Sequence, residues 1–314
     1  MEYTRRYRFS QDLPPGIEPR PIKRSSDRRE AILKAFTPDH PYLPSHYLSQ
    51  FAGGSHQNNQ REFTRMAEKV NSLLAKPAAQ ENSKNADYKH LVYERTEAGA
   101  RFIGEHNQPK QRRREYGHQL LDSLFMASLR VEAAQHGVRL LTWDEIVVHP
   151  KYRGDGNFSH IQLADSALEP DGRPFILTKD DRSVCFLKEI DRRTEPLTAT
   201  SKRPSIEGKL LQYREFMASK AYKRLGFHNC MIIILTTRPL EGVAALAARL
   251  FEQPPTWLLL QRTEDWAHAR HFPNIDGTVP KSAATFRMLS TPYVRVGHAP
   301  FSLQQLMEVP IDHS

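Results

Sequence analysis

Short apolar runs of strand length alternate with amphipathic helical stretches in the part of the chain that follows residue 138. Helical spacing of apolar residues is found at about 205–219 and 240–252. Such alternation is typical of helices packed on a sheet with parallel strands. The strand-like runs are 138–141, 175–178, 184–191, 231–235 and 257–260. The sequence therefore predicts an α/β (α+β) domain built on a mixed sheet.

The first third of the chain has a different pattern, in which short helical stretches precede a strand-like one. Pro38 ends the first helical stretch, a Gly-Gly turn at 53–54 ends the second, and the third covers about 58–75. A polar segment, AAQENSKNADYKH, follows Pro77 and leads into HLVYER. Three helices followed by a hairpin with a polar tip predict a winged helix over residues 23–110.

The third helical stretch is the candidate DNA-binding element, since in a winged helix this helix enters the DNA groove. Opposite its apolar stripe it would present Asn59, Arg61, Arg65 and Lys69. A solvated helix face is the alternative interpretation. The extended basic arm predicted over residues 1–22 and the hairpin favour contact with DNA.

The charge of the chain supports a polyanionic partner. Its formal net charge is +9 at pH 7 and its isoelectric point is about 9.5. Nucleic acid, in the form of double-stranded DNA, is favoured over an acidic membrane surface. Arg112, Arg113 and Arg114 form a basic run near the start of the second domain, which is predicted over residues 111–314.

Several other classes of protein lack support in the sequence. There is no P-loop, no GxGxxG and no GxSxG motif. The longest apolar run, 231–235, is too short to span a bilayer. Cys185 and Cys230 lie in separate apolar stretches, which indicates reduced structural thiols and a cytoplasmic location. No pattern is recognised from Arg287 onward.

Acidic side chains converge in the predicted sheet. Asp171 lies in a Pro-Asp-Gly turn that leads into a strand, and the next strand ends in Glu189, Ile190 and Asp191. Side chains on a strand alternate between faces, so Glu189 and Asp191 point the same way. If the two strands form a hairpin, the three carboxylates meet at one edge of the sheet.

Three converging carboxylates repel one another unless a cation joins them. Oxygen ligands with room for water suit Mg²⁺ or Mn²⁺, which would bind a phosphate and activate a water. Lys209 begins the next helix and flanks its apolar stripe, so it could reach the site and neutralise phosphate charge. Tyr213, on that stripe, is interpreted as a core residue. In the alternative interpretation the acids form only a turn and a solvated strand end.

The order of these elements resembles the replication-relaxation family of bacterial plasmid and mobile-element proteins. The strings that carry the resemblance are GHQLLDSLFMASLRVEAA and PDG…FLKEIDRRTE…KLLQY, and it covers most of the chain. The family is similar to MOBC-type relaxases, whose catalytic domain belongs to the PD-(D/E)xK restriction-endonuclease-like group. The resemblance implies that Asp171 matches the PD acid and Glu189 the first acid of the second motif. Asp191 stands at the third position, where the general motif has Lys.

The resemblance implies a metal-dependent DNA-nicking enzyme that acts at a plasmid or mobile-element origin. Asp171, Glu189 and Asp191 would hold the metal and, with Lys209, carry the catalysis. The acid at position 191 keeps open a second interpretation, a sequence-specific DNA-binding replication or regulatory factor with an inactive nuclease fold. An RNA-associated protein is less favoured because a winged helix usually serves duplex DNA. The sequence leaves open whether the protein is a monomer or a homodimer.

Overall fold

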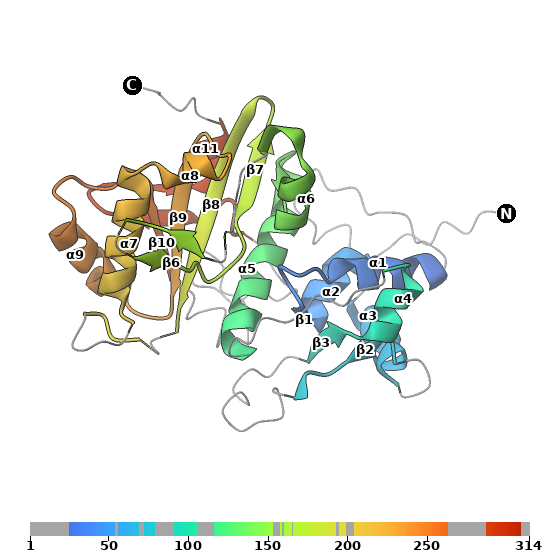
Figure 1. The fold of residues 1–314 in the computed structure, drawn as a ribbon. Helices are drawn as coiled ribbons and strands as arrows, with labels where there is room; N and C mark the ends of the chain where they lie inside the picture. Colours follow the sequence, from blue (N-terminus) through green and yellow to red (C-terminus); the bar gives the residue numbers. More distant parts are fainter. Residues whose placement is uncertain are drawn as a thin grey trace. The chain divides into compact units, whose positions relative to one another are not determined.

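The computed structural model describes residues 25–53, 56–68, 72–78, 91–105, 116–152, 158, 160–164, 166–192, 195–198, 204–262 and 287–308. These residues form two compact units, one from the described residues up to Val131 and one from Glu132 onward (Figure 1). This boundary differs from the predicted division at 110–111. The predicted arm at 1–22 and the basic run Arg112, Arg113 and Arg114 lie outside the described residues.

The first unit combines helices with a small antiparallel sheet whose strand order is β1-β3-β2. Its elements are α1 (Ser25–Ala35), β1 (Tyr42–Pro44), α2 (Ser45–Ala52), α3 (His56–Ala67), β2 (Leu74–Ala75), β3 (Val92–Arg95) and α4 (Glu97–Phe102). The helix α5 (Tyr116–Gln135) follows. The core of the unit includes Ile32, Leu48, Phe63 and Tyr93. The first two predicted helices are confirmed, and β2 and β3 flank the polar segment as an antiparallel pair.

The prediction of one helix over 58–75 is wrong at its C-terminal end. Helix α3 ends at Ala67, and the backbone of Ser72 has a positive φ of 44°. Leu74 and the residue after it form β2 and pair with β3. Buried apolar side chains continue past the end of the helix because strand β2 also buries one, so apolar spacing alone did not mark where the helix ends.

The second unit is built on a seven-stranded mixed sheet with the order β12-β11-β10-β9-β8-β7-β4. The pairs β8–β9 and β9–β10 are parallel, and the other pairs are antiparallel. The strands of this sheet are β4 (Arg139–Leu141), β7 (Phe175–Lys179), β8 (Arg182–Asp191), β9 (Cys230–Thr236), β10 (Leu258–Arg262), β11 (Pro292–Arg295) and β12 (His298–Ser302). The predicted α/β class and the five predicted strands are therefore confirmed.

Helices and a small hairpin accompany this sheet. They are α6 (Trp143–Val148), a 3₁₀ turn (Pro150–Tyr152), β5 (Ile161–Gln162), β6 (Ala167–Leu168), α7 (Ile206–Ala218), α8 (Ala221–Arg224), α9 (Leu240–Leu250) and α11 (Leu303–Glu308). Helix α7 packs beside α9 (Figure 1). Leu210 on α7 and Val243 on α9 share one buried cluster with Leu187 and Ile232 of the sheet. Both helices were predicted within two residues of their observed ends.

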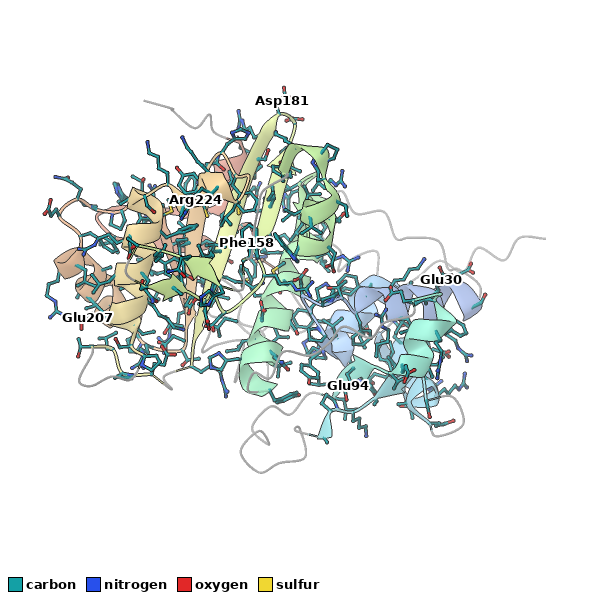
Figure 2. The ribbon with its side chains drawn as sticks, viewed as in Figure 1. Glu30, Glu94, Phe158, Asp181, Glu207 and Arg224 are labelled. Carbon is teal, nitrogen blue, oxygen red and sulfur yellow. The ribbon has the colours of Figure 1, made fainter. Side chains whose placement is uncertain are left out.

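The hairpin of β7 and β8 sets the direction of the acidic residues. Its tip is at Asp180 and Asp181, and Figure 2 labels Asp181 there. Strand β8 therefore runs from this tip toward Asp191 at its other end. Leu187 faces the cluster under α7 and α9, and alternation places Glu189 and Asp191 on the same face.

The segment from Arg287 contributes two strands and a helix that the sequence analysis did not recognise. Strand β11 pairs with β10 and β12 extends the sheet edge. Glu132, near the end of α5, accepts hydrogen bonds from the backbone N–H groups of Leu289 and Ser290. Within the described ranges, no helix is both long enough and apolar enough to cross a membrane.

Candidate functional site

Four side chains from three parts of the second unit meet near the end of β8. Glu189 comes from β8, and Asp171 comes from the turn before β7. Lys209 and Tyr213 lie one turn apart on α7 and so share a helix face. Figure 2 labels Glu207, which marks the first turn of this helix. The structure therefore brings together residues that are up to 42 positions apart (213 − 171 = 42).

Three donors hold the carboxylate of Glu189, which is only 1% exposed. The Tyr213 hydroxyl donates to Oε2 at 2.8 Å, and the backbone N–H of Asp171 donates to the same oxygen at 3.3 Å. The ammonium of Lys209 forms an ion pair with Oε1. A carboxylate with partners on both oxygens has a fixed orientation. Tyr213 is buried as expected, but it is also a polar partner of the site.

Asp171 shares the cation of Glu189. Its Oδ2 lies 3.5 Å from Nζ of Lys209 and accepts a hydrogen bond from the backbone N–H of Ile190 at 2.9 Å. The Pro-Asp-Gly turn is thereby attached to β8. A Cβ at Gly172 would lie within 2 Å of Cε of the buried Lys188 side chain, so a larger residue there would force that side chain to move.

The charges of the cluster depend on one another. Burial and the nearby Asp171 carboxylate raise the pKa of Glu189 to about 7, although Lys209 and Tyr213 act in the opposite direction. Burial lowers the pKa of Lys209, but Glu189, Asp171 and Glu195 outweigh burial and raise it. Lys209 is therefore a cation at neutral pH, while Glu189 exchanges its proton in the physiological range.

Asp191 has different partners. Its Oδ2 accepts hydrogen bonds from Oγ1 of Thr236 at 2.8 Å and from Nε of Arg238 at 2.7 Å. The pairing follows from register, since Asp191 lies opposite Thr236 on the parallel strand β9. The guanidinium of Arg238 thus neutralises the charge of Asp191.

Sequence reasoning missed Arg238 and Glu195. Arg238 follows the apolar run of β9 by two residues, and the ends of parallel neighbours lie at the same sheet edge. That placement was a usable signal once β8 and β9 were known to be neighbours. Glu195 lies 3.5 Å from Lys209, and its backbone carbonyl accepts a hydrogen bond from Arg238. Nothing in the sequence distinguishes Glu195 from a surface residue.

Among the described residues, the Asp171–Glu189 pair is the candidate for holding a divalent cation. No group of three or more His, Cys, Asp or Glu side chains that could hold a metal ion occurs among the described residues. The two carboxylates nevertheless converge on one positive charge, the Lys209 ammonium. Mg²⁺ is commonly held by one or two carboxylates together with water and phosphate. The pair fits such an ion if Lys209 moves aside, and Asp191 remains a predicted third ligand.

The predicted DNA-binding face of α3 needs one correction. Asn59 is fully buried, and its Nδ2 donates to the carbonyl of Gly53 at 2.9 Å, so it supports the start of the helix. Arg61 and Arg65 are exposed. Lys69 lies outside the described residues. The exposed face of the helix is polar and comprises Gln57, Asn58, Gln60, Arg61, Thr64 and Arg65.

One comparison with known proteins covers residues of both units. A family model described as replication-relaxation matches residues 38–229, which is more than half of the chain. The match includes Arg61, Asp171, Glu189 and Lys209 and ends before Arg238. No curated protein and no solved structure matches the chain.

Proposed function

The chain belongs to the replication-relaxation family, and we propose that it is a metal-dependent enzyme that nicks DNA at the origin of a plasmid or mobile element. The family match supports a role in plasmid or mobile-element replication or relaxation. The observation that carries the proposed chemistry is the convergence of Asp171 and Glu189 on Lys209.

Each residue of the cluster has a proposed role. Asp171 and Glu189 hold Mg²⁺ or Mn²⁺, with Asp191 as the predicted third ligand. The bound cation would supply positive charge to the phosphate and lower the pKa of a water molecule. Tyr213 keeps Oε2 of Glu189 oriented through its hydroxyl. Lys209, already a cation at this position, neutralises charge on the DNA phosphate once it leaves the carboxylates.

The first unit is proposed to be the DNA-binding module. Its order of helix, strand, two helices and two strands is the order of a winged helix. In that fold the helix equivalent to α3 lies in the major groove of duplex DNA. The polar exposed face of α3 and the net charge of +9 support this assignment.

The direct test is to incubate the protein with supercoiled DNA that carries the origin of its own element. We expect conversion to the nicked circle with Mg²⁺ or Mn²⁺ and none when a chelator is present. The same plasmid without the origin is the control, because a relaxase can be specific for its site. Intact supercoiled origin DNA in both metals, under conditions where the protein binds it, would remove the nuclease proposal.

One observation favours a second candidate, a DNA-binding replication factor without cleavage activity. Lys209 is already paired with Asp171 and Glu189, and Arg238 is paired with Asp191. Each acid therefore has a cationic partner without a metal. Specific binding to origin DNA without nicking in either metal would select this candidate.

Helix α3 allows a separate prediction about DNA binding. Replacing Arg61 and Arg65 together with Ala should weaken binding to duplex DNA by roughly 1–3 kcal/mol, because each loses a guanidinium that can reach phosphates or base edges. Anisotropy titration with labelled DNA measures the change. Arg101→Ala on α4 is the matched control, since its side chain is 65% exposed against 66% for Arg65 and is likewise ion-paired within its helix. Equal affinities of the double variant and the control would show that α3 is not the recognition helix.

A further inference from the structure

Lys209 and Arg238 lie with Asp171 and Glu195 at the part-exposed side of the carboxylate site. The side chains of Lys209 and Arg238 are 18% and 20% exposed and those of Asp171 and Glu195 are 16% and 28% exposed, whereas those of Glu189 and Asp191 are each 1% exposed. A solute that enters from solvent therefore meets these four part-exposed groups before it meets Glu189 and Asp191. Because Glu195 is the most exposed of the four, an anion that binds the two cations competes first with this acid.

A single residue, Glu195, supplies an oxygen to both cations. Its Oε1 lies 3.5 Å from Nζ of Lys209, and its backbone carbonyl accepts a hydrogen bond from Nη2 of Arg238. The segment is attached to the start of α7, because the carbonyls of Pro196 and Leu197 accept hydrogen bonds from the first backbone N–H groups of the helix. The backbone that directly follows Glu195 is therefore held by the first turn of α7.

The contacts between Glu195 and the two cations use only part of the hydrogen-bonding capacity of these side chains. Its Oε2 is buried and has no hydrogen-bond partner among the described residues. Arg238 donates to Asp191 and to the Glu195 carbonyl, yet a guanidinium has five N–H donors. A phosphate group presents several acceptor oxygens and suits both an ammonium and a planar guanidinium. It would therefore satisfy the two cations better than one carboxylate oxygen and a carbonyl do.

We propose that Lys209 and Arg238 are the phosphate-binding pair of this site, and that Glu195 occupies the position of a DNA backbone phosphate when DNA is absent. Arg238 contacts the phosphate, and Glu195 competes with it. The proposal rests on the proposed function for the identity of its ligand, DNA. The contacts among Lys209, Arg238 and Glu195 do not depend on whether the site cleaves.

The test compares Glu195→Gln with Glu207→Gln as a matched control. Both variants lose one negative charge, and Glu207 is also part-buried at 22% and ion-paired, but with Arg249. Affinity for a short duplex is measured by anisotropy, and affinity for inorganic phosphate is measured from the Arg Nε–Hε and Lys ammonium signals in NMR spectra. All titrations contain a chelator, so neither metal binding nor cleavage contributes.

We expect Glu195→Gln to bind both the duplex and inorganic phosphate about 2- to 5-fold more tightly than Glu207→Gln, which corresponds to the modest strength of a part-exposed ion pair. Arg238→Lys, which keeps the charge but loses the planar fork, should lower both affinities in the Glu195→Gln background. Equal affinities in the two glutamine variants, weaker binding by Glu195→Gln, or no effect of Arg238→Lys would each overturn the proposal. A gain for inorganic phosphate without one for the duplex would also overturn it, because DNA would then not be the ligand.

These outcomes are distinct from failure of the proposed function. If the wild-type protein never nicks origin DNA but Glu195→Gln still binds the duplex more tightly, the phosphate-binding pair stands and the nuclease proposal falls. If nicking occurs and the glutamine variants do not differ in affinity, the nuclease proposal stands and the phosphate-binding pair falls.

Discussion

Replacing Lys209 with Met should lower the free energy of unfolding by about 3–5 kcal/mol at pH 8, the cost of removing one partner from a buried ion pair. Glu189 is 1% exposed and would lose the ammonium that it shares with Asp171. Methionine has a similar length, so the change removes charge with little loss of volume. Urea unfolding of both proteins measures the difference. Lys223→Met, at an exposed position on α8, is the control and should change stability by less than about 0.5 kcal/mol.

The loss of stability in Lys209→Met should depend on pH. The pKa of Glu189 in the folded protein is raised to about 7, above its value of about 4.3 in an unfolded chain. The folded state therefore binds this proton more tightly, and the stability that the proton contributes is lost as pH rises from about 4 to 7. Without Lys209 the pKa of Glu189 in the folded protein rises further, so the loss of stability in Lys209→Met should be largest above pH 8 and smallest near pH 5. An equal loss of stability at both pH values would show that Lys209 acts through packing and not through charge.

Adding Mn²⁺ or Mg²⁺ should stabilise the wild-type protein. Binding to the folded state alone contributes RT ln(1 + [L]/Kd), or about 2.7 kcal/mol at a hundredfold excess over Kd. Glu189→Gln should abolish this response, since an amide replaces a carboxylate while an oxygen remains to accept from Tyr213. Glu207→Gln, on the same helix as Lys209, should keep the full response. Calorimetric melting with and without metal measures all three proteins.

An absent metal response in the wild-type protein would leave the acids as a structural ion-pair network. A response that survives in Glu189→Gln would place the metal elsewhere in the chain. Each result contradicts the assignment of Asp171 and Glu189 as ligands.

The larger elements of the second unit could be predicted because their signals are local. Strands such as β9 are apolar runs of fitting length, and alternation along β8 was enough to put Glu189 and Asp191 on one face. Helical spacing on α7 placed Lys209 beside the stripe that contains Tyr213. Convergence of Asp171 and Glu189 then required that β7 and β8 form a hairpin, and the approach of Lys209 required that α7 pack on the same face of the sheet.

The remaining features depend on tertiary pairing that no local pattern encodes. Arg238 meets Asp191 only because β9 is the parallel neighbour of β8, and the strand order was not predictable from the sequence. Strand β11 has little apolar alternation of its own and forms by pairing with β10 and β12. Asn59 was predicted to lie opposite the apolar stripe of α3, whereas it lies one turn before the buried Phe63, and its side chain satisfies the carbonyl of Gly53.

The rate of nicking by Glu189→Gln tests the central claim most directly. Supercoiled DNA with the native origin is incubated in saturating Mn²⁺ with wild-type protein, Glu189→Gln and Glu207→Gln, at protein concentrations where all three bind the DNA fully. The account predicts that Glu189→Gln nicks at least roughly 10²–10³-fold more slowly than the other two, the usual cost of removing one electrostatic group from a catalytic site. Equal rates in all three proteins would contradict the account, because the cleavage chemistry would then not depend on the Asp171–Glu189 site.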